Sequence, residues 1–150
     1  MTMEQHTVAA LVRDRGSDDL ITVPASATVA EAVATMAERE VGAVLLMSED
    51  DLVSGIFSER DLLTRVVNAG RDPKATPISL VMTRDVKFVS PGTTIEAALA
   101  LMYVQRFRHL LVIDGARVFG LISMRDLAYH MITHGEGRFE AAVRRAASAP

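Results

Sequence analysis

The sequence predicts a mixed α/β (α+β) fold in which one β-α-β-β-α unit occurs twice. The main observation is an internal repeat: Gly-Ile-Phe-Ser-Glu-Arg-Asp-Leu at 55–62 returns at 120–127 with five identities. Upstream, segment 28–36 matches 94–102 at an offset of 66, whereas the glycine motif matches at an offset of 65. Repeat 2 therefore lacks one residue, which we place in the turn near Asp114. An internal repeat divides a fold into units before local propensity is considered.

Composition narrows the classes of function. The 150 residues carry a net charge of -3, with 16 basic and 19 acidic residues spread along the chain, so no basic stripe for nucleic acid is present. The chain contains no cysteine, which excludes thiolate metal sites and thiol catalysis. No apolar run approaches the roughly 18 residues of a membrane span. We expect a soluble, cytoplasmic protein that binds neither nucleic acid nor membrane.

The first half of the chain divides into an N-terminal segment and repeat 1. In the segment 1–16, Val8, Leu11 and Val12 stand at i, i+3 and i+4, which predicts a short helix over 7–15 that belongs to neither repeat. Repeat 1 covers 17–70. Its alternating apolar runs, turn residues and Thr28 as an N-cap predict these elements: strand 20–23, helix 28–40, strand 41–47, strand 52–57 and helix 58–68.

A linker and repeat 2 follow. The linker, 71–85, contains two prolines and a short helical segment, 78–82. Repeat 2 covers 86–133 and repeats the same order: strand 86–89, helix 94–106, strand 109–113, strand 117–122 and helix 123–133. In the C-terminal segment, 134–150, Phe139 and Val143 at i, i+4 predict an amphipathic helix over 138–147.

The motif shared by the repeats places Ser-x-x-Asp where a strand turns into a helix. The free N–H groups and the dipole at a helix start suit a phosphate, and a carboxylate can accept hydrogen bonds from two ribose hydroxyls. A second interpretation is equally open on the residues alone: Ser-x-x-Asp is a short relative of the capping box and starts a helix without any ligand. The two roles are compatible.

The order of a glycine-initiated strand followed by Ser-x-x-Asp resembles the CBS domain (cystathionine-β-synthase-type domain). The resemblance covers roughly 17–133 and is carried by the motifs at 55–61 and 120–126 and by Arg-Phe-Arg-His-Leu-Leu-Val at 106–112. The layout is similar to that of stand-alone CBS pairs (Bateman modules). It implies a pseudo-twofold pair with facing sheets and two clefts that bind AMP, ADP, ATP, NAD or S-adenosylmethionine.

The resemblance also implies which residues contact the ligand. The ribose would be bound by Asp61 and Asp126, with Ser58 and Ser123 beside them. First-strand residues would line the adenine pockets: Thr22, Val23, Phe88 and Val89. On the residues alone these four are equally well core strand residues. Arg60 and Arg125 stand directly before the motif aspartate in the two copies. They either meet phosphates or form surface pairs, which contribute little when exposed.

The two copies differ in charge. At the entry to its second strand repeat 2 has Arg106, Arg108 and His109, where repeat 1 has Glu40, Gly42 and Ala43. Arginine offers a planar fork for phosphate, and the resemblance implies that a basic residue here contacts the ligand phosphate. Arg108 and His109 are therefore the phosphate candidates. Gly42 and Ala43 leave room for a base or sugar but supply no charge, so we expect one competent site and one doubtful site.

Catalysis and metal binding are not expected. His130 and His134 stand at i, i+4, a spacing that can place two imidazoles on one metal. No glutamate lies between them and the sequence indicates no third ligand, so cationic histidine at a helix C-terminus is the preferred interpretation. The serines lack a Gly-x-Ser-x-Gly elbow. The protein is expected to be neither an enzyme nor dependent on an obligatory cofactor.

Two functions remain. The first is a regulatory, energy-sensing module that binds an adenine nucleotide in the cleft between the repeats and modulates a partner protein that the sequence does not identify. The second is a purely structural dimerisation module in which Ser-x-x-Asp only caps helices. A homodimer is expected in both cases, because the terminal helices have apolar faces outside the repeats that require cover.

Overall fold

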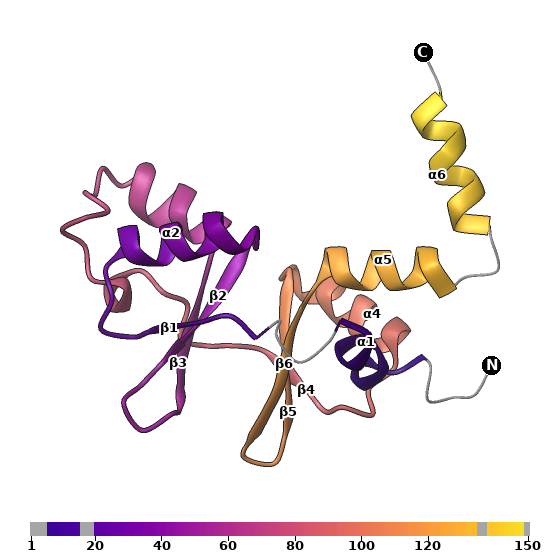
Figure 1. Ribbon diagram of the computed structural model, residues 1–150, viewed down its shortest axis with the longest axis horizontal. Helices are drawn as coiled ribbons and strands as arrows, with labels where there is room; N and C mark the ends of the chain where they lie inside the picture. Colours follow the sequence, from indigo (N-terminus) through magenta and orange to yellow (C-terminus); the bar gives the residue numbers. More distant parts are fainter. Residues whose placement is uncertain (1–5, 16–19, 135–137, 149–150) are drawn as a thin grey trace. The chain divides into compact units, whose positions relative to one another are not determined.

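The chain forms two compact units, one of which is discontinuous in sequence. The computed structural model describes residues 6–15, 20–134 and 138–148. One unit comprises Asp18–Val86, and the other combines Met1–Ser17 with Lys87–Pro150. Each unit has its own three-stranded sheet and its own hydrophobic core. The predicted α+β fold with two β-α-β-β-α repeats is confirmed (Figure 1).

Repeat 1 builds a sheet in the order β1-β2-β3, in which β1 is parallel to β2 and β2 is antiparallel to β3. Thr28 and Glu31 form a complete capping box at the start of α2. The helix predicted after Ser58 begins as α3 but continues as one π-helical segment, η3. The elements are β1 (Thr22–Pro24), α2 (Val29–Arg39), β2 (Ala43–Met47), β3 (Val53–Ser58), α3 (Glu59–Asp61), η3 (Leu62–Val67) and, in the linker, η4 (Ile78–Leu80).

Repeat 2 has the same topology, with the order β4-β5-β6. Its elements are β4 (Phe88–Val89), α4 (Ile95–Gln105), β5 (His109–Asp114), β6 (Arg117–Ser123) and α5 (Met124–His134). The missing residue lies in the predicted turn: Met47 pairs with Val53 in repeat 1, whereas Ile113 pairs with Val118 in repeat 2. Gly115 occupies that turn with φ +59°, a conformation that glycine adopts without strain.

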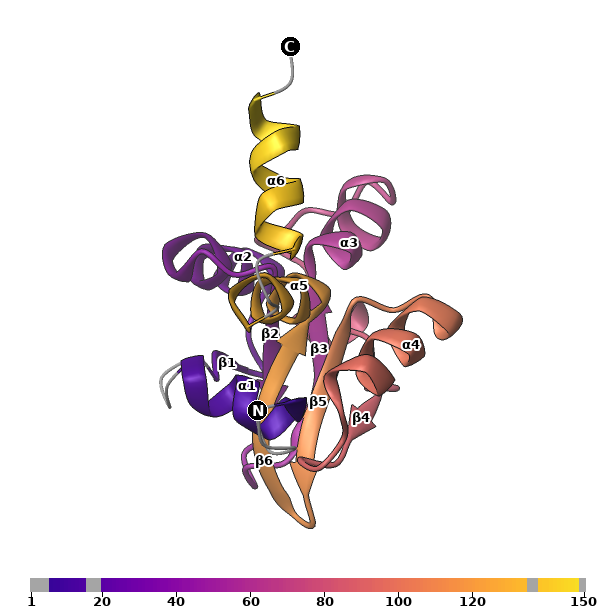
Figure 2. The ribbon, with the colours of Figure 1, turned by 90° about the vertical axis from the view of Figure 1, so that its right-hand side faces the viewer.

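The N-terminal helix α1 (Val8–Arg15) belongs to the unit of repeat 2, so the expectation that it stands outside both repeats is wrong. Val8 and Leu11 are buried in the core of repeat 2, and Val12 packs against it. In both views α1 lies beside β6 and α5 (Figures 1 and 2). Tertiary burial accounts for the difference: the apolar stripe that was expected to need a second copy is already covered.

The linker completes the core of repeat 1, as α1 completes the core of repeat 2. Ile78, Val81 and Met82 are buried in the core of that unit. Beyond η4 the chain joins the edge of β3, where Ile56 and Thr83 exchange backbone hydrogen bonds of 2.9 and 2.8 Å. A Cβ at Gly55 would lie 2.7 Å from the Thr83 carbonyl oxygen, so the glycine of the first motif is required by this close approach.

The C-terminal helix is present as α6 (Arg138–Ser148), close to the predicted bounds. The side chains of Phe139 and Val143, on which its apolar face was predicted, lie outside the described residues. Within the described parts of the chain, none of the helices has both the length and the apolar character that crossing a membrane requires.

Truncation of Leu11 to alanine tests whether α1 completes the core of repeat 2. Leu11 is 2% exposed, and loss of a buried leucine side chain costs about 2–5 kcal/mol through lost burial and an unfilled cavity. The matched control, Leu52→Ala, removes a side chain that is 65% exposed and should change stability by about 0.5 kcal/mol at most. Urea unfolding monitored by circular dichroism measures both. Equal midpoints for the two variants would contradict the packing of α1.

Gly55→Ala tests the approach of the linker to β3. The added methyl would overlap the Thr83 carbonyl oxygen, and such overpacking costs about 1–3 kcal/mol. At Gly92 a Cβ would meet nothing within 4 Å, so Gly92→Ala should be neutral or stabilise by up to about 1 kcal/mol. Thermal unfolding of the two variants compares them directly, and an unchanged melting temperature for Gly55→Ala would contradict the contact.

Candidate functional site

The candidate site in repeat 2 forms where β5 begins and β6 runs into α5. The backbone N–H of Met124 donates to the carbonyl oxygen of Arg108 at 3.0 Å, which ties the strand entry to the helix start. Register places His109 directly opposite Ser123 across the β5-β6 pair. Residues directly opposite in an antiparallel pair have Cβ atoms about 4.5–5.5 Å apart. His109 and Ser123 are therefore neighbours, and the Arg108 backbone adjoins them.

Asp126 caps the start of α5. Its Oδ2 accepts a hydrogen bond of 2.7 Å from the Ser123 backbone N–H, and its own N–H donates to Ser123 Oγ at 3.1 Å. These are the reciprocal contacts of a capping box. The Asp126 side chain is partly exposed, and Arg125 beside it is exposed, as is Arg108. The helix start of repeat 2 thus combines a carboxylate, a serine and cationic side chains that solvent can reach.

Side chains alternate between the two faces along a strand. This alternation determines which residues of the first strands lie on the same face as the motif serines. Phe88 pairs with Leu111, which lies two residues beyond His109, so Phe88, His109 and Ser123 share one face of the sheet. Phe88 is 65% exposed there. Val89 lies on the opposite face within the core of repeat 2, and Val23 likewise lies within the core of repeat 1. The side chains of the two valines therefore do not line the face that carries the serines.

Repeat 1 has the same backbone arrangement with different chemistry. The Glu59 N–H donates to the Gly42 carbonyl oxygen at 3.0 Å, and Ala43 lies opposite Ser58. The Glu59 carboxylate carbon is 3.4 Å from the position of a Cβ on Gly42. The Glu59 carboxylate thus lies against the position at which the Arg108 side chain begins in repeat 2. Its negative charge disfavours a phosphate there. Thr22, the counterpart of Phe88, is exposed on its strand.

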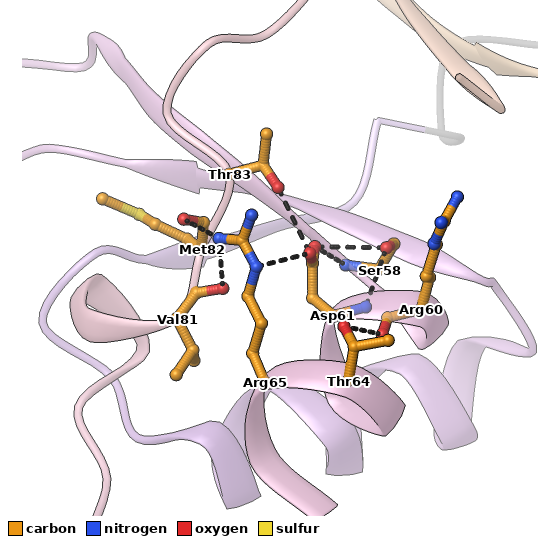
Figure 3. A network of polar contacts seen from close by, with 8 residues as sticks. All are labelled: Ser58, Arg60, Asp61, Thr64, Arg65, Val81, Met82 and Thr83. Atoms are coloured by element: carbon orange, nitrogen blue, oxygen red, sulfur yellow. Dashed lines mark hydrogen bonds and ion pairs between the residues drawn. The ribbon is translucent and has the colours of Figure 1, made fainter. Parts of the chain in front are cut away.

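The carboxylate of Asp61 is fully engaged, as Figure 3 shows. Oδ2 accepts from the Ser58 N–H at 3.0 Å and from Ser58 Oγ at 3.1 Å. Oδ1 accepts from Thr83 Oγ1 at 3.2 Å and lies 3.5 Å from Arg65 Nε. A carboxylate offers about four lone-pair sites, so these contacts use its whole capacity, and Asp61 is only 7% exposed.

Arg65 extends this network to the linker. Its Nη1 donates to the carbonyl oxygens of Met82 at 3.2 Å and Val81 at 3.4 Å. Arg60 is exposed and enters the network of Figure 3 only through its backbone oxygen, which accepts from Thr64 Oγ1 at 2.8 Å. The partners of Asp61 were missed from the sequence, although an arginine four residues after an aspartate on a helix is a recognisable ion-pair signal.

Comparison with known proteins agrees with this architecture. The family model "CBS domain" matches residues 12–68 and 78–133. The CBS domain-containing protein CBSCBSPB1 of Arabidopsis thaliana is 36% identical over 116 residues, which cover 77% of this chain and 21% of that protein. The chain therefore spans about a fifth of the length of this curated plant relative.

Solved structures have the same fold. The CBS-domain containing protein ATU1752 from Agrobacterium tumefaciens aligns with a TM-score of 0.79 and 32% identity, covering 85% of this chain and 95% of that one. The CBS domain protein PAE2072 from Pyrobaculum aerophilum, complexed with AMP, aligns with a TM-score of 0.71 and 22% identity over 95% and 99% of the two chains. The repeated sheet topology, the two family matches and these relatives lead to one conclusion: the chain belongs to the CBS-domain family and carries a pair of CBS domains.

Proposed function

We propose that this chain is a non-catalytic regulatory module that binds an adenine nucleotide at the start of α5. The observation that carries the proposal is the difference in charge between two otherwise equivalent helix starts. Repeat 2 presents Arg108 where repeat 1 presents the Glu59 carboxylate over Gly42. Phosphate groups favour cationic partners and helix N-termini. Both copies have an exposed arginine beside the motif aspartate, Arg60 or Arg125, but repeat 2 adds Arg108 where repeat 1 has a carboxylate.

Each residue has a chemical role in this proposal. Asp126 accepts hydrogen bonds from the ribose hydroxyls, Ser123 contacts a sugar or phosphate oxygen, and Arg108 pairs with the phosphate, with Arg125 and His109 adjoining. The exposed ring of Phe88 lies on the face shared with His109 and offers an apolar surface to adenine. AMP bound to the relative PAE2072 supports this ligand class. In repeat 1, the saturated Asp61 carboxylate favours a structural role for that copy.

Calorimetric titration of the full chain with AMP, ADP, ATP, NAD and S-adenosylmethionine tests the proposal. We expect heat and a raised melting temperature with at least one ligand, and Asp126→Asn should weaken that ligand by roughly 10- to 100-fold, because hydrogen bonds to a charged group contribute about 1.5–3 kcal/mol. The asparagine oxygen can still accept from the Ser123 N–H, which preserves the cap. Asp61→Asn is the matched control, expected to lower stability but to retain affinity.

Two further comparisons sharpen the test. Arg108→Ala should weaken AMP by about tenfold and leave adenosine unchanged, because adenosine has no phosphate. Arg106→Ala removes an equal charge from the same strand entry and should have little effect. Absence of heat and of any melting shift with all five ligands at millimolar concentration would remove the proposal. If no ligand binds, Asp126→Ala should still lower the free energy of unfolding by about 1 kcal/mol, because the helix loses its cap.

We further propose that two copies of the chain associate. Tyr103 and Val104 on α4 and Tyr129 on α5, two helices that contact each other within their unit, are large side chains between 69% and 81% exposed. Clustered exposed apolar side chains mark interaction surfaces, and a ligand modulates association only when it binds the two states with different affinity.

Light scattering at two protein concentrations should give the mass of a dimer, and Tyr103→Lys should lower it toward that of a monomer. Leu52→Lys, at a position that is also largely exposed, serves as the control and should leave the mass unchanged. A wild-type protein that is monomeric at both concentrations would contradict the association.

A further inference from the structure

Three potential metal ligands meet at one end of the unit that contains repeat 2. His130 and His134 lie one turn apart on α5, and Asp14 comes from the last turn of α1. One ligand atom from each of the three lies within 4.8 Å of the others. Asp14 is held in this place because Val8 and Leu11 anchor α1 in the core. The sequence indicated no third ligand, since Asp14 is distant from the histidines along the chain.

One ring nitrogen of His134 contacts a backbone carbonyl oxygen and a hydroxyl. Nδ1 lies 3.2 Å from the carbonyl oxygen of His130 and 2.9 Å from Thr133 Oγ1. The Thr133 hydroxyl is itself directed to the carbonyl oxygens of Tyr129 and His130. A carbonyl oxygen only accepts, so the contact with His130 is a hydrogen bond in the tautomer that carries its proton on Nδ1, and Nε2 is then the nitrogen that faces an ion. Histidines that bind metal typically donate one ring N–H to a backbone carbonyl in this way, which leaves the other nitrogen for the ion.

The second nitrogen of His134 faces a carboxylate. Nε2 lies 3.7 Å from Asp14 Oδ2. In the Nδ1–H tautomer, the Nε2 lone pair and the carboxylate both face that space, which suits a metal ion as well as a water molecule that donates to both atoms. Bonds of 2.0–2.2 Å in a tetrahedral zinc site put neighbouring donor atoms about 3.3–3.5 Å apart. The observed separation is within a few tenths of an ångström of this value.

His130 supplies the third ligand after a small rearrangement. Its ring is 5% exposed and stacks on that of His134, with centroids 4.2 Å apart and planes inclined by 18°. One ion cannot lie in the planes of two stacked rings, so one ring has to turn. His134 is the ring with the freedom to do so, because its side chain is 40% exposed, and the Asp14 side chain is 57% exposed. The turn changes the present contacts of Nδ1 and Nε2, which are therefore those of the metal-free state.

We propose that Asp14, His130 and His134 bind a divalent transition-metal ion. Two imidazoles and one carboxylate suit Zn²⁺, Ni²⁺, Co²⁺ or Cu²⁺, whereas Mg²⁺ and Ca²⁺ prefer oxygen ligands only. Three protein ligands leave at least one coordination position to water. The ion joins α1 to α5, so the metal-bound state holds the N-terminal helix in the unit more firmly than the metal-free state does.

The test uses the full chain, without an affinity tag that contains histidine and after dialysis against a chelator. Titration with ZnCl₂ or NiCl₂ should give one ion per chain and a raised melting temperature, and MgCl₂ should give neither. CoCl₂ should produce the visible absorption of cobalt bound to nitrogen. His134→Ala and Asp14→Asn both alter exposed side chains, so both variants should fold, and each should weaken zinc by at least tenfold.

Matched controls remove the same residue types elsewhere. His6→Ala and Asp114→Asn each take away one histidine or one carboxylate outside the cluster and should bind zinc as the wild type does. Absence of zinc, nickel and cobalt binding in the wild-type chain would overturn the proposal. Wild-type zinc affinity in Asp14→Asn would overturn the three-ligand site, and equal losses in His6→Ala and His134→Ala would overturn its location.

Discussion

The structure depends on the burial of two short segments that lie outside the repeats in the sequence, α1 and the linker. In one unit the linker residues Ile78, Val81 and Met82 complete the core of repeat 1. In the other, Val8 and Leu11 of α1 complete the core of repeat 2. A unit of about 60 residues or fewer buries only about 60% of the surface of its unfolded chain, so each repeat is marginally stable by itself. The added apolar side chains increase the core without lengthening the repeat.

The polar contacts of Asp61 in one unit and of Asp14 in the other depend on this burial. Once the linker is fixed on β3, Thr83 and the carbonyl groups of residues 81 and 82 become available to Asp61 and Arg65. Once α1 is fixed on β6 and α5, Asp14 meets His134. The positions four residues after the motif aspartates are Arg65 and His130. The repeat thus conserves a backbone frame between its two copies while the side chains at equivalent places perform different chemistry.

Much of this was predictable because the repeat and the alternation of apolar residues determine topology. The order of strands and helices, the hairpins and the residue missing near Asp114 all follow from local patterns. The packing of segments that are distant in the sequence does not follow from local patterns. Val8 and Leu11 showed an apolar stripe, but nothing in the local sequence indicates that repeat 2 covers it. The partners of Asp61 and the approach of Asp14 to His134 arise only after distant segments have packed.

The candidate site in repeat 2 was likewise predictable only in part. Strand register brings His109 and Ser123 together, and Arg108 adjoins them through its backbone. These candidates were selected from the resemblance of the sequence to CBS domains. The burial of Val23 and Val89 in the two cores depends on which face each strand turns toward its helices. A two-residue strand such as β4 is too short for a pattern of alternation to indicate that face.

The discontinuous unit imposes an order on folding. Residues 18–86 contain every segment that their core requires, so this unit can fold while the rest of the chain is still being synthesised. Helix α1 is synthesised before residues 18–86, yet its partners on β6 and α5 are synthesised after them. Its contacts span most of the chain, and such distant contacts slow folding because a long loop must close before they form. Until β6 and α5 are available, Val8 and Leu11 lack the core that buries them, so α1 packs only after the unit between them has been synthesised.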